Sequence, residues 1–141
     1  MLTFWRRSGA RSIAVICLTL IGVIMISFFV RHLLALMEFG LSLDLALQAE
    51  STWSIEGPFL VYAAVYGLLA VGIALRWRIA HVLAVVATSW LVVGAIAGLA
   101  GGYELPVELV AATALSAIAF VALLGSWRDF WKRRGDVSCP S

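Results

Sequence analysis

Four long apolar runs are the feature that most constrains what this chain can fold into. They cover residues 12–30, 57–75, 79–101 and 105–127, and none has a charged side chain in its middle. An α-helix rises about 1.5 Å per residue, so each run would measure about 28–35 Å as a helix, close to the thickness of a bilayer's hydrocarbon core. The sequence therefore predicts an all-α polytopic membrane protein with four antiparallel transmembrane helices.

The composition agrees with this class. Of the 141 residues, 63% are hydrophobic and 13% are charged, and the mean hydropathy is +1.04. In soluble domains roughly a quarter of the residues are charged, and outer helix faces carry many of them. Here the charges are confined to the ends of the apolar runs and the segments between them. We expect one transmembrane domain over residues 1–141, with an outer loop at 31–56 and a cytoplasmic tail at 128–141.

The charges are also sorted by sign across the predicted membrane. Nine of the ten Lys and Arg residues fall on one side of a four-pass chain: Arg6, Arg7, Arg11, Arg76, Arg78, Arg128, Lys132, Arg133 and Arg134. Six of the eight Asp and Glu residues fall on the other: Glu38, Asp44, Glu50, Glu56, Glu104 and Glu108. Because basic loops stay in the cytoplasm, both termini are predicted to be cytoplasmic and the protein to lie in the cell inner membrane. Each basic cluster adjoins an apolar run, so we expect no nucleic-acid-binding surface.

Small residues in the third run predict a helix-packing seam. Gly94, Gly98 and Gly102 recur at every fourth position, which places them on one helix face. In a bilayer such a face lets a neighbouring helix backbone approach closely. Two interpretations stay open, because the neighbour is either another helix of the same chain or a helix of a second copy.

A layer of polar and aromatic side chains lies near mid-membrane depth in three of the predicted spans. Its members are Tyr62, Tyr66, Thr88, Ser89, Trp90 and Ser116. Trp90 is unusual there, because tryptophan prefers the membrane interface. One interpretation is a pocket for a lipid, a quinone or another flat ligand. The other is a set of hydrogen bonds between helices, each contributing about 0.6 kcal/mol.

At the outer end of the bundle, Arg31 is predicted to meet Glu104 or Glu108, an ion pair that would tie the first span to the fourth. The outer loop joins the first and second spans. Its residues 31–38 read as a continuation of the first helix. Residues 41–48 then alternate apolar and polar side chains, as a strand does, but a lone strand edge is costly near lipid. We expect a short interfacial helix or an extended segment packed over the outer mouth of the bundle.

The sequence offers little chemistry. No ionisable residue lies at the centre of a span, which argues against a proton-coupled transporter or a pump. His32 and His81 are predicted at opposite membrane faces, so one chain cannot bring both to a single haem iron or metal ion. We therefore expect no catalytic residue, no metal site and no cofactor.

These observations predict a small, non-enzymatic accessory or scaffolding subunit of a membrane protein assembly. Its partners would be the lipid bilayer and other membrane-protein subunits or copies of itself. An oligomeric small-solute channel or transporter is the first alternative. A lipid- or quinone-binding membrane protein that uses the polar layer is the second.

Overall fold

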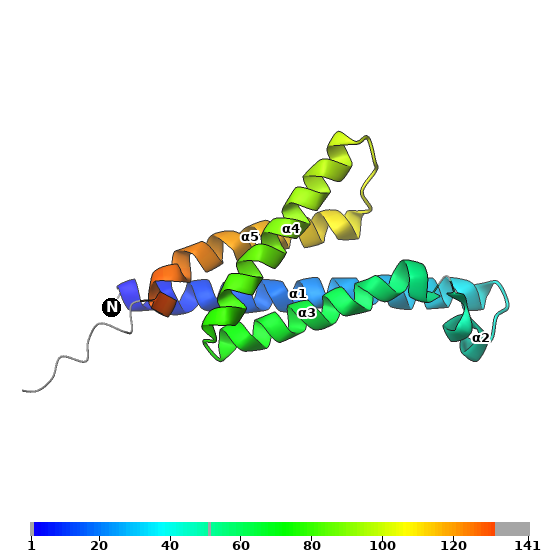
Figure 1. Cartoon of the computed structure of the whole chain (residues 1–141), viewed down its shortest axis with the longest axis horizontal. Helices are drawn as coiled ribbons and strands as arrows, with labels where there is room; N and C mark the ends of the chain where they lie inside the picture. Colours follow the sequence, from blue (N-terminus) through cyan, green and yellow to red (C-terminus); the bar gives the residue numbers. More distant parts are fainter. Residues whose placement is uncertain (1, 51, 132–141) are drawn as a thin grey trace, which may run out of the picture.

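A computed structural model describes residues 2–50 and 52–131, and every regular element in them is helical (Figure 1). The elements are α1 (Leu2–Glu38), α2 (Leu43–Gln48), a short π-helical segment η1 (Thr52–Glu56), α3 (Gly57–Ala74), α4 (Arg78–Ala100) and α5 (Val107–Trp131).

Four helical segments are long and apolar enough to cross a membrane: Gly9–Glu38, Thr52–Ala74, Arg78–Ala100 and Val107–Arg128. The predicted all-helical fold with four candidate spans is confirmed for the described part of the chain.

Helix α1 lies between α3 and α5 and packs against both (Figure 1). Leu18, Ile21 and Met25 on α1 are fully buried at the centre of the core. A Cβ added to Gly22 would lie 3.4 Å from the carbonyl oxygen of Ala63, so the backbones of α1 and α3 approach closely there. Helix α1 thus lies at the centre of the bundle.

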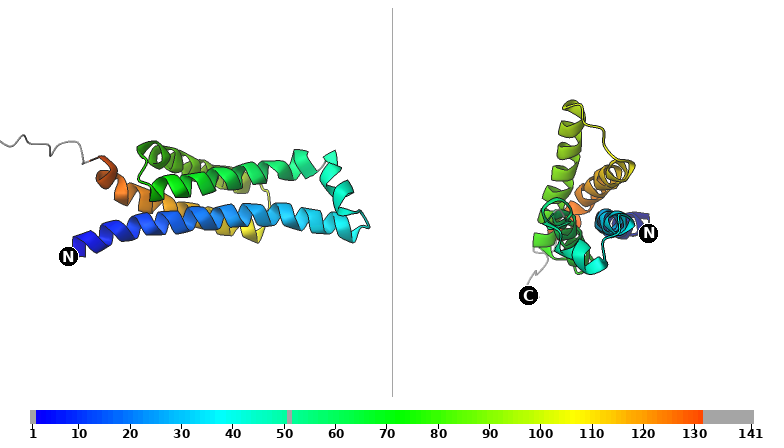
Figure 2. Two further views of the ribbon diagram at one scale, coloured as in Figure 1. Left: turned by 90° about the horizontal axis from the view of Figure 1, so that it is seen from below. Right: turned by 90° about the vertical axis from the view of Figure 1, so that its right-hand side faces the viewer.

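Helices α3 and α4 touch at one end and separate at the other. They are joined by a turn of three residues, 75–77, and a Cβ on Gly72 would overlap the Cβ of Ala80. From there α4 inclines away from α3, and in the end-on view its far half stands clear of α1 (Figure 2). The two helices therefore pack closely only near the turn.

The outer segment folds into short helices that pack on α1 and α3. Ser42 caps the N-terminus of α2 by accepting from the backbone N–H of Leu45. The Thr52 hydroxyl donates to the Ala46 carbonyl at 2.7 Å, and the Trp53 indole donates to the Leu47 carbonyl at 2.6 Å. The short-helix interpretation is confirmed for Leu43–Gln48. Among the described residues this segment contacts α1 and α3 but neither α4 nor α5, so it packs over one side of the outer end.

Helix α1 runs to Glu38, so the continuation of the first helix over residues 31–38 is confirmed, and this part of the expected loop 31–56 is helical. Helix α5 runs to Trp131, so the first residues of the expected tail 128–141 are helical as well. The rest of that tail, 132–141, lies outside the described residues.

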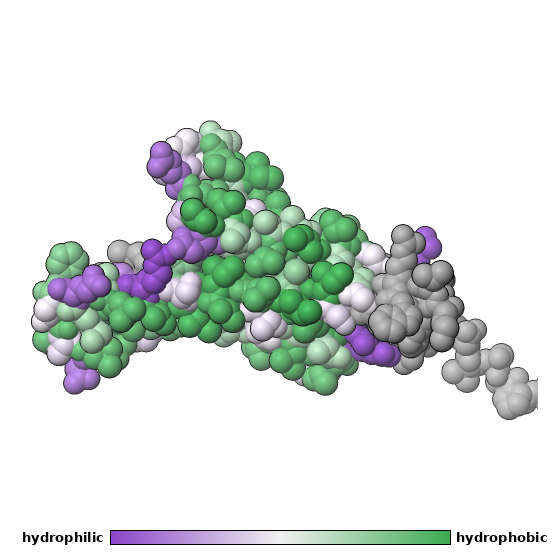
Figure 3. All heavy atoms as spheres, turned by 180° about the vertical axis from the view of Figure 1, so that it is seen from behind, coloured by the Kyte–Doolittle hydropathy of each residue, from purple (hydrophilic) through white to green (hydrophobic). Residues whose placement is uncertain are grey.

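On the face drawn in Figure 3, apolar side chains cover the middle of the molecule, and hydrophilic ones gather toward its ends and at the base of the α4 arm.

Candidate functional site

Three helices meet at Tyr66, the centre of the predicted polar layer. Tyr66 lies on α3 and is only 3% exposed, and its hydroxyl donates to the Ala87 carbonyl of α4 at 3.0 Å. Ser116 of α5 is fully buried beside the Tyr66 side chain. Thr88 of α4 is fully buried too, but its hydroxyl donates to the Ala84 carbonyl of its own helix at 2.8 Å. The structure therefore brings Tyr66 together with Ser116, and it buries Thr88 with its hydroxyl bonded to its own helix.

The other three members of the layer lie differently. Trp90 is 72% exposed, and Tyr62 is 44% exposed although it lies close to Tyr66, one turn away on the same helix. Trp90 follows Thr88 by two positions, about 200° around the helix, so the two side chains point to opposite sides. The Ser89 hydroxyl donates to the Val85 carbonyl of its own helix at 2.7 Å. Trp90 therefore does not face the same space as Thr88, which the interpretation of one pocket lined by all six residues requires.

Tyr66 also explains why α4 leaves α3. At the turn, Gly72 and Ala80 present almost no side chain and the backbones touch. About two helical turns further along, the whole phenol ring of Tyr66 stands between α3 and the Ala87 carbonyl. Because the side chains between the two helices are small at the turn and large at Tyr66, two straight helices must diverge. Helix α4 continues on that course, packing against α5 instead.

The predicted glycine seam lies on the diverging half of α4. Gly94 follows Ala87 by seven residues, so both lie on nearly the same helix face. A Cβ on Gly94 would have no atom within 4 Å, whereas a Cβ on Gly98 would lie 3.7 Å from a Leu105 methyl. Gly102 lies in the turn after α4, with a φ of +78°, a left-handed conformation that favours glycine. It is therefore a turn residue and not part of the seam, because α4 ends at Ala100.

We call Trp90, Gly94 and Ala97 the open face of α4. They follow one another at helical spacing, and all three are exposed. The bulky indole at one end and the two small residues beside it form a shallow step in the helix surface. Within the described chain, α4 also has the smallest buried share among the candidate spans, 17% against 28% to 39% for the others.

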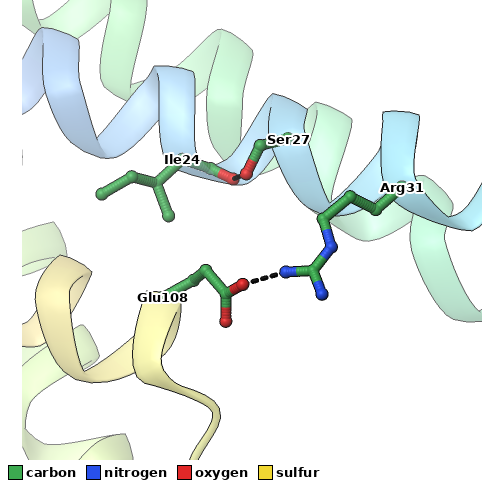
Figure 4. A network of polar contacts seen from close by, with 4 residues as sticks. All are labelled: Ile24, Ser27, Arg31 and Glu108. Carbon is green, nitrogen blue, oxygen red and sulfur yellow. Dashed lines mark hydrogen bonds and ion pairs between the residues drawn. The ribbon is translucent and has the colours of Figure 1, made fainter.

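An ion pair joins α1 to α5. The Arg31 guanidinium on α1 donates to a Glu108 carboxylate oxygen in the first turn of α5 (Figure 4). The carboxylate also suits the positive end of the α5 dipole. Glu104, the other predicted partner, is exposed in the connection between α4 and α5. The structure thus contains the predicted tie between the first and fourth spans, with Glu108 as the acid.

A further cluster lies beside the α3–α4 turn, and its contacts were not predicted. His81 is fully buried, with its ring centroid 5.3 Å from that of Trp127. Trp127 stacks on Trp131 at 5.7 Å, and the Arg78 guanidinium lies 5.8 Å from the Trp131 ring centroid. The i, i+4 spacing of the two tryptophans and the i, i+3 spacing of Arg78 and His81 are the sequence signals that indicate such a cluster.

Neither histidine belongs to a metal site in the described residues, where no three His, Cys, Asp or Glu side chains gather. His81 packs in the aromatic cluster, and His32 is half-buried near the far end of α1.

Comparison with known proteins found no matching family model, curated protein or solved structure.

Proposed function

We propose that this chain is a small integral inner-membrane protein that serves as a non-enzymatic accessory or scaffolding subunit. In this proposal the open face of α4 receives a transmembrane helix of a partner subunit. The observation that carries it is Gly94, which has space around it within the chain although it lies on the face that α4 first presents to α3.

The chemistry of the face favours a helix as its occupant. Lipid tails are as apolar as leucine side chains, so helices in a bilayer associate by close packing rather than by the hydrophobic effect. Gly94 and Ala97 let an incoming backbone approach α4 closely, and Trp90 offers a large flat ring beside them. Tyr62, which is half-exposed and one turn from Tyr66 on α3, adds a hydroxyl for a polar contact.

The orientation in this proposal rests on the arginines. Arg11, Arg76, Arg78 and Arg128 all lie near the end of the bundle that holds the α3–α4 turn. The tendency of basic residues to remain in the cytoplasm favours that end, and with it both termini, as cytoplasmic. The open face of α4 then lies toward the outer leaflet.

Purification from native membranes in a mild detergent, followed by mass spectrometry of proteins, tests the proposal. The chain should co-purify with at least one other membrane protein, and Gly94→Leu should reduce that recovery about tenfold or more. Gly125→Leu is the matched control, because a Cβ on Gly125 of α5 also has no atom within 4 Å. A monodisperse species without any partner, or equal recovery for the two variants, would contradict the proposal.

An oligomeric small-solute channel or transporter is the second candidate, favoured by the spacing of Gly94 and Gly98. Two glycines four residues apart are typical of helices that dimerise with their own copies. This candidate predicts cross-linking between cysteines placed at position 94 of two copies, and solute flux into liposomes that contain only this protein. The ligand-binding alternative has less support, since Trp90 is 72% exposed and lies on the opposite side of α4 from the buried Thr88.

A further inference from the structure

We propose that the α3–α4 turn and the end of α5 bind the phosphate headgroup of an anionic phospholipid. The site is the basic–aromatic patch, which we define as Arg76, Trp77, Arg78, Arg128 and Trp131. It lies at the end of the molecule away from the open part of α4 and is independent of the proposed partner contact. Figure 2 shows the turn and the end of α5 close together there.

Arg78 is held in place rather than free in solvent. Its guanidinium lies over the Trp131 ring, Trp131 stacks on Trp127, and Trp127 packs edge-on against the buried His81. This chain of contacts runs from the surface into the core and joins the first turn of α4 to the last turns of α5. A stacked guanidinium loses less freedom when it binds a phosphate than a flexible one does.

Helix electrostatics do not explain a cation at this position. Arg78 is the first residue of α4, where the positive end of the helix dipole disfavours positive charge. The first turn of α4 contains no acidic residue, and its N-cap, Trp77, makes no side-chain capping hydrogen bond. An arginine and the first N–H groups of a helix therefore lie together with no anion supplied by that turn. A phosphate would satisfy both.

Arg76 adds a second cation at a conformational cost. Its φ is +61°, in the left-handed region, at a helix end where glycine is the usual residue. The backbone bonds of this ending are complete, with Trp77 N–H donating to the Gly72 carbonyl at 2.8 Å and Arg76 N–H to the Ile73 carbonyl at 3.1 Å. Glycine would make the same bonds without strain, so the side chain of Arg76, and not its backbone, accounts for an arginine there.

The surroundings match a lipid better than a free anion. Leu75 and Ile79 flank the two arginines in sequence and are 58% and 76% exposed, which provides an apolar surface for acyl chains. Trp77 and Trp131 are also exposed, and tryptophan rings mark the depth at which headgroups meet the hydrocarbon. Guanidinium groups at headgroup depth, with apolar side chains beside them, are complementary to an anionic phospholipid.

Native mass spectrometry of the full chain in detergent, titrated with phosphatidylglycerol or phosphatidylcholine of equal chain length, tests this inference. We expect discrete one-lipid adducts with phosphatidylglycerol at concentrations where phosphatidylcholine gives few. A cation near an anionic lipid surface contributes about 1 kcal/mol, so Arg78→Gln should weaken phosphatidylglycerol binding about fivefold. Arg76→Gly should weaken it to a similar degree while leaving the protein at least as resistant to thermal unfolding without lipid.

The control is Arg11→Gln, which removes a charge from α1 at the same end of the molecule but outside the patch. It should change phosphatidylglycerol binding less than twofold. Three results would overturn the proposal: equal adducts with the two lipids, an Arg11→Gln effect as large as that of Arg78→Gln, or displacement of the lipid by millimolar inorganic phosphate. The last result would indicate a general anion site. None of these readouts depends on a partner protein, so they do not test the accessory-subunit proposal.

Discussion

The two ends of α4 belong to one continuous helix, yet they are held in different ways. At the turn end, Gly72 and Ala80 bring α3 and α4 into backbone contact, and His81 is fully buried against Trp127. At the other end Gly94 has no atom near its Cβ position, and Ile96 is 61% exposed. Both ends belong to one apolar candidate membrane span. Hydrophobicity therefore places a helix in the membrane, but side-chain size at each level decides which neighbour it keeps.

The largest expected effect comes from removing the side chain that separates the two helices. Tyr66→Ala should lower the free energy of unfolding by about 3 kcal/mol, as truncation of buried aromatic side chains does. It should also let the far end of α4 move toward α3. Reversible unfolding in mixed micelles measures the first effect, and distances between spin labels at positions 61 and 99 measure the second.

Tyr62→Ala is the control for that variant, because Tyr62 is on the same helix and half-exposed. It should change both quantities little. A Tyr66→Ala protein with unchanged label distances would show that Tyr66 is not the spacer and that the angle of α4 is set elsewhere.

A second prediction compares two glycines. Gly72→Leu should destabilise the fold by about 2 kcal/mol, because the added side chain meets Ala80 across a backbone contact. Gly94→Leu should leave the isolated chain as stable as before, since it enters open space. Unfolding in detergent of both purified variants checks this pair, and equal destabilisation would mean that Gly94 is packed within the chain after all.

The smallest effect is expected for the ion pair between α1 and α5. Arg31 and Glu108 are 64% and 34% exposed, and exposed ion pairs contribute up to about 1 kcal/mol. A double-mutant cycle of Arg31→Gln and Glu108→Gln should give a coupling below that value, and salt should weaken it. A coupling several times larger would indicate that this end of α1 is held as firmly as the turn end of α4.

The sequence predicted part of the candidate sites. It selected Arg31 and Glu108 as residues of one interfacial layer, and the two form an ion pair. The packing seam that it predicted at Gly94 stays a prediction, because no other part of the described chain lies against that residue. The sequence could not separate Trp90 from Tyr66, because residues at one membrane depth share a layer without sharing a face. It also missed the contacts of His81, since they depend on how closely α4 and α5 pack.

The sequence alone predicted an all-helical chain with four candidate membrane spans, because run length and hydropathy are local properties of each segment. The charge sorting on which the proposed orientation rests is also a property of the sequence, whereas for the outer segment the sequence left a short helix and an extended segment open. Only the tertiary structure decided that α1 is central and that α4 leaves α3 beyond Ala87. Those facts depend on pairs of side chains far apart in sequence, such as Gly22 with Ala63 and Tyr66 with Ala87, and no pattern within one helix contains them.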